Sequence, residues 1–167
     1  MIKTIIFDLD GVLIESKEIH FKALNKALPF EYRIGYEEHL STYDSLPTKQ
    51  KLELLTITKN LPEDLHSEIA KNKAKETMNV LFDTIKPRME FTKIFMALKN
   101  AGYRIALASN AVRSTVETAL DCLELRKYFD VVYSNEDVKK PKPNIEMYLK
   151  IMLDLNSKPG ETLILED

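Results

Sequence analysis

The sequence predicts an α/β protein in which a Rossmann-like parallel sheet carries a helical segment inserted after its first strand. Short β-branched or aliphatic runs alternate with longer amphipathic segments over most of the chain. The stretch 15–86 breaks this alternation, because its apolar residues recur only at helical spacing. At 167 residues the chain can form one core with an insert, but it is too short for two full domains.

The expected strands and helices follow one another in a regular order. The predicted strands are 4–7, 104–108, 131–133 and 162–165, and the predicted helices are 91–101, 113–123 and 145–155. Such an alternation implies a parallel sheet covered on both faces and joined by right-handed crossovers. In sheets of this kind, binding sites form beyond the carboxyl ends of the strands.

The insert is predicted to consist of several helices. The segments "TKQKLELLTITKN" and "PEDLHSEIAKNKAKETMNVLFDTI" both have apolar residues at helical spacing, and Pro62 stands where a helix can begin. Pro87 ends the helical stretch before the α/β pattern resumes. We therefore predict a core formed by 1–14 and 87–167 and a helical cap formed by 15–86, which would hang over the end of the first strand.

Composition excludes several classes of protein. With 24 basic and 26 acidic residues the formal net charge is −2, so no large basic surface predicts a nucleic-acid partner. The apolar runs are too short for a bilayer and the N-terminus lacks the regions of a signal peptide, so we expect no membrane partner. Cys122 is the only cysteine and can form no internal disulfide, which suits a reducing cytoplasm.

Four polar motifs stand at comparable places, one after each predicted strand. They are "DLDG", "ASNA", "KKPKP" and "LED". Because the carboxyl ends of parallel strands meet at one edge of a sheet, their side chains should converge there. The residues expected to meet are Asp8, Ser109, Lys140, Glu166 and Asp167.

These motifs, in this order, resemble those of the haloacid dehalogenase-like (HAD) hydrolases. Within that family the chain is similar to the helical-cap group that includes β-phosphoglucomutase and many sugar-phosphate phosphatases. The resemblance covers nearly the whole chain through "FDLDGVL", "ASN", "KPKP" and "ED". It implies a Mg²⁺ ion held by the Asp8 carboxylate, the Asp10 backbone carbonyl and the Asp167 carboxylate, with Glu166 as a further candidate ligand.

The chemistry of the motifs points to phosphoryl transfer. Asp8 is ionised at neutral pH, needs no base, and is the expected nucleophile, while Mg²⁺ would allow it to approach a phosphate dianion. Asp10 could protonate the leaving oxygen and later deprotonate water. A halide leaving group needs no proton, and by resemblance dehalogenases lack this second acid, so its presence favours a phosphatase over a dehalogenase.

The neighbouring motifs are predicted to bind the phosphate. Gly11 permits a tight turn that lets backbone N–H groups face the phosphate. Ser109, with Asn110 beside it, should hold a phosphoryl oxygen, and Lys140 should neutralise the charge that builds up between Asp8 and the substrate.

Each motif also has a purely structural interpretation. The acids of "DLDG" could be turn formers, the polar residues of "ASNA" could cap the following helix, and the lysine of "KKPKP" could be solvated. The acids of "LED" could be a charged terminus. Only their joint placement favours the functional interpretation.

Three residues of the insert are candidate substrate contacts. His20 lies in the first helix, where the mutase branch of the resembled family has a histidine near the nucleophile, although an exposed helical histidine would give the same pattern. Thr48 and Lys49 start a later helix and could reach a substrate between cap and core. For Lys49 and Lys51 a solvated helix face is the competing interpretation.

Three functions remain open at this stage. The first is a Mg²⁺-dependent phosphatase acting on a small phosphorylated metabolite, with sugar phosphates preferred. The second is a phosphomutase, and the third is a non-catalytic phosphoacceptor or truncated fragment. Resembled proteins continue past the "ED" motif, so we expect the last strand and helices of the core to be missing here. We expect a monomer, with association through the exposed sheet edge as the alternative.

Overall fold

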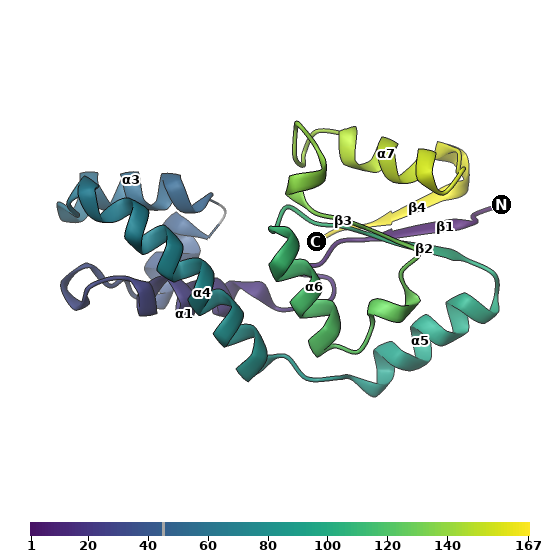
Figure 1. Ribbon diagram of the computed structural model, residues 1–167, viewed down its shortest axis with the longest axis horizontal. Coiled ribbons are helices and arrows are strands. Elements are labelled where there is room, and N and C mark those ends of the chain that lie inside the picture. The colour runs from purple at the N-terminus through teal and green to yellow at the C-terminus, as the bar shows by residue number, and fades with distance from the viewer. Residues whose placement is uncertain (45) are drawn as a thin grey trace. The chain divides into compact units, whose positions relative to one another are not determined.

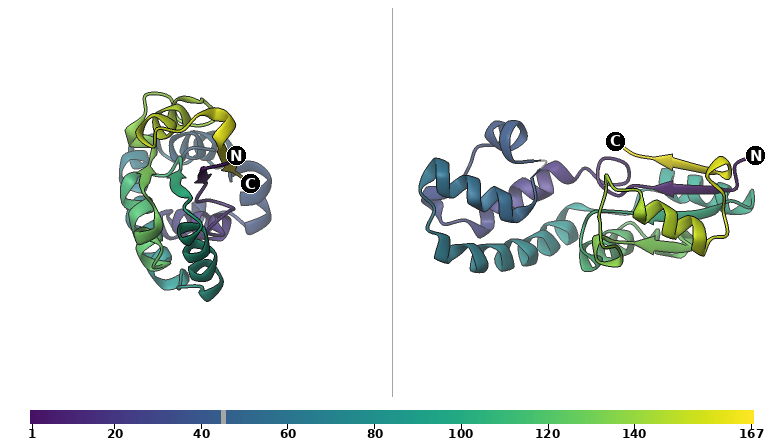
Figure 2. Two further views of the ribbon diagram at one scale, coloured as in Figure 1. Left: turned by 90° about the vertical axis from the view of Figure 1, so that its right-hand side faces the viewer. Right: turned by 90° about the horizontal axis from the view of Figure 1, so that it is seen from above.

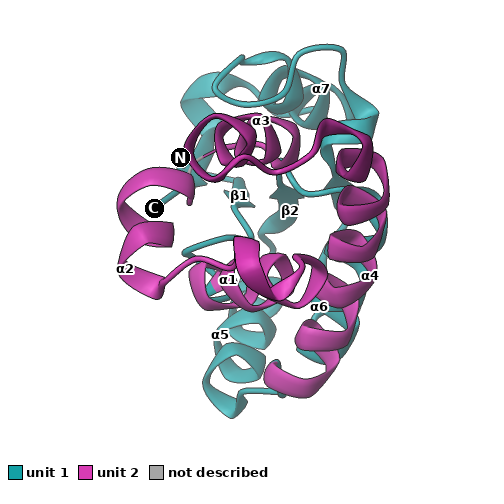
Figure 3. Ribbon diagram, turned by 90° about the vertical axis from the view of Figure 1, so that its left-hand side faces the viewer, with its two compact units in different colours: residues 1–15, 85–167 teal, residues 16–84 magenta. Residues whose placement is uncertain are grey.

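The computed structural model of the protein describes residues 1–44 and 46–167. It divides into two compact units, coloured separately in Figure 3: Met1–Glu15 with Ile85–Asp167, and Ser16–Thr84. The first unit holds every strand of the described residues, whereas the second is built from helices. The unit Ser16–Thr84 lies within the range 15–86 that was expected to form the insert.

The first unit contains a four-stranded parallel sheet. Its strands are β1 (Thr4–Phe7), β2 (Arg104–Ala108), β3 (Val131–Tyr133) and β4 (Thr162–Leu165), in the spatial order β3-β2-β1-β4. The predicted parallel α/β fold is confirmed, and the strand bounds are those expected from the apolar runs. Figure 2 shows β1 and β4 side by side, with the N- and C-terminal ends of the chain at opposite ends of the paired strands.

Helices cover both faces of the sheet, as Figure 1 shows. One face packs on α7 (Glu146–Asp154), where Ile6 and Ala106 contact Met147 and Ile151. The other face lies toward α5 (Met89–Asn100) and α6 (Arg113–Cys122). Alternation along β1 sends Phe7 to this second side, where its ring centroid is 4.9 Å from that of Phe95.

The edge strand β4 is less well covered than the strands in the centre. All four residues of β1 are buried, but Leu163, Ile164 and Leu165 of β4 are 37–44% exposed. β1 pairs on both sides, whereas β4 pairs with β1 alone among the described strands. The carboxyl ends of β1 and β4 nevertheless remain in register, because Phe7 pairs with Leu165.

The second unit has its own apolar core. Its helices are α1 (Ser16–Ala27), α2 (Tyr36–Glu38), α3 (Thr48–Lys59) and α4 (His66–Thr84), and a π-helical turn, His39–Tyr43, follows α2. Leu24, Tyr43, Leu52 and Leu55 are almost fully buried within this unit. The expected helical character of the segment is therefore found throughout its regular elements.

Candidate active site

Asp8 lies at the carboxyl end of β1, where the strand leaves the sheet. Its backbone N–H donates to Leu165 O at 2.9 Å, which continues the pairing with β4 by one residue. Its side chain is buried, and the Leu9 backbone N–H donates to Asp8 Oδ1 at 2.7 Å. Burial in the strand end therefore fixes both the position and the orientation of this carboxylate.

The lysine that contacts Asp8 is Lys142. Its Nζ is 2.8 Å from Asp8 Oδ1, and it also donates to both oxygens of Glu166 at 3.1 and 3.2 Å. Only 10% of the Lys142 side chain is exposed. The motif "KKPKP" therefore places a lysine beside Asp8, and this lysine is the one in the second Lys-Pro dipeptide of the motif.

Lys140, the lysine expected from the sequence to lie beside Asp8, does not occupy this position; Lys142 does. Lys140 is exposed, and its backbone N–H donates to Glu146 Oε2 at 3.0 Å. The loop therefore passes Lys140 along the start of α7 and brings Lys142 to the strand ends. Since the motif repeats the Lys-Pro dipeptide, sequence spacing alone could not separate the two.

Burial dominates the electrostatics of Asp8. Desolvation raises the pKa of the Asp8 carboxyl to about 6, although the hydrogen bond and charge of Lys142 act in the opposite direction. The nearby Glu166 carboxylate raises the pKa further. Because a pKa of about 6 is still below 7, Asp8 is mainly an anion at neutral pH and can act as a nucleophile.

Gly11 forms the turn that follows β1. Its φ of +76° lies in the left-handed region, and its N–H donates to Ile14 O at 2.8 Å. A Cβ atom at Gly11 would lie 2.6 Å from Asp167 Cβ, so a larger residue would displace the Asp167 side chain. Glycine is therefore required here for both the turn and the close approach of Asp167.

The residues at this turn suit a hard cation. In the described part of the chain, no group of three His, Cys, Asp or Glu side chains encloses a metal site. The Asp167 side chain nevertheless lies against the backbone of Gly11, the residue that follows Asp10, and Asp8 leaves the neighbouring strand end. Carboxylate and backbone carbonyl oxygens, completed by water, are the donors that Mg²⁺ prefers.

Glu166, the remaining predicted ligand, makes contacts of another kind. Its carboxylate accepts hydrogen bonds from Lys142 Nζ and from the Tyr148 hydroxyl. Burial, followed by the contact with Glu166, raises the pKa of Tyr148, so the hydroxyl stays protonated and remains a donor. Tyr148 was not anticipated from the sequence, although its place in the first turn of α7, shortly after the "KKPKP" motif, was the available signal.

Ser109 and Asn110 follow β2, next to the same edge. Ser109 is fully buried, and its Oγ accepts the Ala111 N–H at 3.0 Å. The side chain of Asn110 reaches Lys142, where its Oδ1 accepts the backbone N–H and its Nδ2 donates to the backbone carbonyl, each at 2.9 Å. Asp8, Ser109, Asn110, Lys142 and Glu166 are thus gathered from four strand ends.

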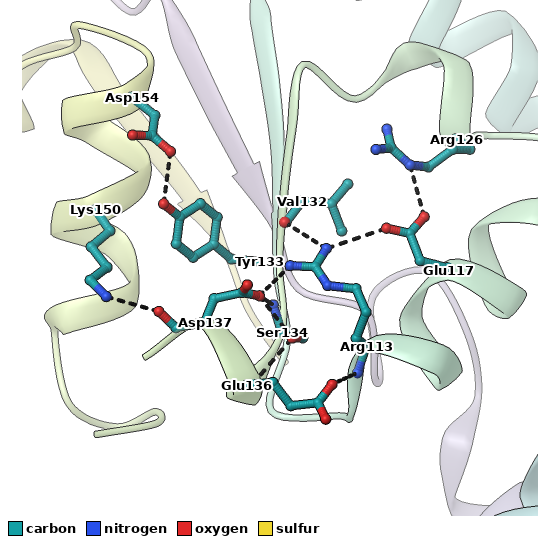
Figure 4. A network of polar contacts seen from close by, with 10 residues as sticks. All are labelled: Arg113, Glu117, Arg126, Val132, Tyr133, Ser134, Glu136, Asp137, Lys150 and Asp154. Carbon is teal, nitrogen blue, oxygen red and sulfur yellow. Dashed lines mark hydrogen bonds and ion pairs between the residues drawn. The ribbon is translucent and has the colours of Figure 1, made fainter. Parts of the chain in front are cut away.

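A network of ion pairs fixes the turn after β3 (Figure 4). Arg113 at the start of α6 pairs with Asp137, and its guanidinium also donates to Val132 O at 3.1 Å. Asp137 in turn accepts the backbone N–H of Ser134 at 2.7 Å. These contacts hold the chain that leads from β3 into the loop of Lys142.

Comparisons with known proteins identify the family of the chain. The family model for haloacid dehalogenase-like hydrolases matches residues 5–167, which include all four strand-end motifs.

The chain belongs to the haloacid dehalogenase-like hydrolases.

Individual relatives match this hydrolase along almost its whole length. Pyrophosphatase PpaX of Bacillus cereus is 29% identical over 177 residues, covering 99% of this chain and 74% of PpaX. The crystal structure of a Thermotoga maritima protein, provisionally assigned as a β-phosphoglucomutase, superposes with a TM-score of 0.82 at 26% sequence identity. The match covers 99% of this chain and 76% of the Thermotoga maritima chain. CbbY from Rhodobacter sphaeroides in complex with phosphate shares the fold with a TM-score of 0.82 at 24% identity, covering 100% and 78%.

The helical unit of the hydrolase contains the other predicted contacts. His20 lies on α1, and burial, together with the charges of Lys73 and Lys51, lowers its pKa to about 3, so its imidazole is neutral. Thr48 begins α3, and Lys49 is 86% exposed in its side chain and pairs with Glu53. Among the described residues, no helix of this unit or of the other has the length and apolar run needed to cross a membrane.

For Lys51, the solvated helix face considered in the sequence analysis is wrong, because this residue of the helical unit is buried. Only 2% of it is exposed, and its Nζ donates to the backbone carbonyl of Asp44 at 3.2 Å. Burial and the nearby Lys73 lower its pKa to about 8. Its spacing from Leu52 and Leu55 places it on the buried face of α3, which was the available signal.

Proposed function

We propose that this chain is a Mg²⁺-dependent phosphatase that hydrolyses a small phosphorylated metabolite through an aspartyl-phosphate. The observation that carries the proposal is the buried pair of Asp8 and Lys142, which joins an anionic nucleophile to a cation 2.8 Å away. Membership of the haloacid dehalogenase-like hydrolases and the similarity to a pyrophosphatase support phosphate ester or anhydride chemistry.

In the first step, an oxygen of Asp8 attacks phosphorus and the bond to the leaving oxygen breaks. Asp10, which is half-buried in the turn after β1, donates a proton to that oxygen as it leaves. In the second step, water attacks the phosphoryl group and gives up a proton to the Asp10 carboxylate, and the bond to Asp8 breaks to release phosphate.

The remaining residues lower the charge barrier to these steps. Lys142 would stabilise the negative charge that builds up on the transferring phosphoryl oxygens, and Ser109 would hold one of those oxygens. Asp8, the Asp10 carbonyl and Asp167 would hold Mg²⁺, which supplies positive charge against the phosphate dianion. We assign the role first expected of Lys140 to Lys142 on the basis of its contact with Asp8.

The substrate is proposed only as a class. A sugar phosphate remains the preferred substrate, and the name of the Bacillus cereus relative adds pyrophosphate as a specific candidate. Phosphomutase activity is the second candidate function, favoured by the similarity to the Thermotoga maritima protein. We further propose a cytoplasmic location and a monomer; Cys122 is a free thiol, as a reducing compartment would allow.

A panel assay tests the proposal. Free phosphate is measured for the chain with sugar phosphates and with pyrophosphate, in Mg²⁺ and again after chelation, and Asp8→Asn serves as the control. We expect Mg²⁺-dependent release that the variant lacks. Isomerised sugar phosphate without free phosphate, stimulated by a sugar bisphosphate, would instead indicate a mutase. Mg²⁺ binding without turnover of any substrate would contradict the proposal and favour a phosphoacceptor.

A further inference from the structure

Asn110 holds the backbone of Lys142 from the end of β2. Its side-chain amide makes two hydrogen bonds to one residue, accepting the Lys142 N–H and donating to the Lys142 carbonyl, each at 2.9 Å. The two bonds together satisfy the backbone donor and acceptor of Lys142, as a neighbouring strand would. A single bond would permit rotation about its axis, whereas this pair fixes the orientation of the peptide groups that flank Lys142.

The rest of the loop is attached elsewhere. The Glu146 carboxylate at the start of α7 accepts the backbone N–H groups of Lys139 and Lys140, both at 3.0 Å. Asn144 Oδ1 accepts the Glu146 N–H at 3.0 Å, and the Asn144 N–H donates to Pro141 O at 3.0 Å. These bonds tie the loop to α7, while those of Asn110 tie Lys142 itself to the strand that precedes Ser109.

The position of the Lys142 backbone determines where its ammonium group can reach. A lysine side chain has several rotatable bonds and gains its specific geometry only from its surroundings. Here the Nζ must lie between Asp8 at 2.8 Å and Glu166 at 3.1 Å. A displaced backbone would move the ammonium group away from Asp8 or force its side chain into less favourable rotamers.

We propose that Asn110 is a positioning residue that acts through Lys142. Its own side chain is committed to the Lys142 backbone, so its effect on the reaction is exerted by keeping the ammonium group on Asp8. The expected effect on kcat rests on the proposed function, whereas the effect of Asn110 on the Lys142 backbone does not depend on it.

A double-mutant cycle tests the proposal. Turnover is measured for the wild type, Asn110→Ala, Lys142→Met and the double variant, with the best substrate from the panel. We expect Asn110→Ala to lower kcat by roughly 10- to 100-fold with little change in KM, the range found for supporting residues. In the Lys142→Met background the same change should have almost no further effect. Equal losses in both backgrounds, or no loss in either, would overturn the proposal.

A second measurement separates the proposal from the proposed function. Amide hydrogen exchange at Lys142 is compared between the wild type, Asn110→Ala and the control Asn79→Ala, an exposed residue of α4 whose side chain contacts Glu76. We expect faster exchange at Lys142 in Asn110→Ala only. If no phosphatase activity is found, this result alone decides whether Asn110 holds Lys142, and unchanged exchange would overturn the inference.

Discussion

Two buried lysines distinguish the two units of the molecule. Lys142 in the sheet unit lies between two carboxylates, 2.8 Å from Asp8 and 3.1 Å from Glu166. Lys51 in the helical unit is also buried, but its Nζ donates to a neutral carbonyl oxygen, Asp44 O, at 3.2 Å. Both ammonium groups are largely shielded from water, but in the described part of the chain only that of Lys142 forms ion pairs with carboxylates.

The different partners of Lys142 and Lys51 indicate different roles for the two lysines. The carboxylates around Lys142 keep its charge in place and orient it toward the proposed nucleophile. Among the described residues, no carboxylate forms an ion pair with Lys51, and burial lowers its pKa to about 8. The comparison predicts that removing Lys142 harms activity, whereas removing Lys51 improves the stability of its unit.

The largest effect is expected at the carboxylate that pairs with Lys142. Asp8→Asn should lower turnover at least roughly 10⁴-fold, because the nearly isosteric amide is a poor nucleophile. Circular dichroism and thermal melting would check that the fold is retained. Phosphate release by the folded variant at the wild-type rate would exclude Asp8 as the nucleophile.

The next largest effect separates the two lysines of "KKPKP". Lys142→Met should lower kcat by about 10²- to 10³-fold, since it removes charge stabilisation from the reacting group. Lys140→Met is the matched control, and because Lys140 is exposed it should change kcat by less than about threefold. Steady-state kinetics of both variants decide the matter, and the reverse order of effects would restore Lys140 as the functional lysine.

A smaller effect is expected on the stability of the helical unit. At pH 7, Lys51→Met should stabilise the chain against urea by about 1–3 kcal/mol, because an incompletely paired buried charge is replaced by an apolar side chain. The exposed Lys49→Met should change stability by less than about 0.5 kcal/mol.

The pH dependence of this stabilisation provides its control. Since the pKa of Lys51 is lower in the folded state, about 8 against 10.5, folded Lys51 binds fewer protons than unfolded Lys51 between these values. Wild-type stability should therefore rise with pH across this window, and the advantage of Lys51→Met should shrink. An advantage that stays constant from pH 7 to pH 10 would contradict the assignment.

The smallest effect is a change in the titration of Asp8. In the metal-free protein we expect the Asp8 carboxyl to titrate near pH 6, and Lys142→Met should raise its pKa further. Because the pKa of Asp8 is higher in the folded state than in the unfolded state, protonation of Asp8 stabilises the fold. This contribution to the free energy of unfolding is fully present below pH 3.8 and is lost as the pH rises through about 6. Carbon NMR of the carboxyl groups measures this, and a lower pKa in the variant would refute the pairing.

The sequence predicted the sheet well because apolar runs and strand ends are local signals. All four strands and the glycine turn after β1 were found where the residues indicated. Lys142 was missed because the path of its loop depends on side-chain contacts with Asn110 and Glu146, which are distant in sequence. Lys51 was missed because a lysine on an amphipathic helix was assumed to be solvated, although its spacing from Leu55 placed it on the buried face.

If Asp8 carries the phosphoryl group during turnover, a phosphorylated Asp8 must form before phosphate is released, and this intermediate can be trapped. The chain is mixed with its best substrate and Mg²⁺, quenched in acid within milliseconds, and its peptides are examined by mass spectrometry. We predict a phosphoryl group on the peptide that contains Asp8, formed before free phosphate appears and absent in Asp8→Asn. Rapid turnover without any such adduct, or an adduct on another residue, would contradict it.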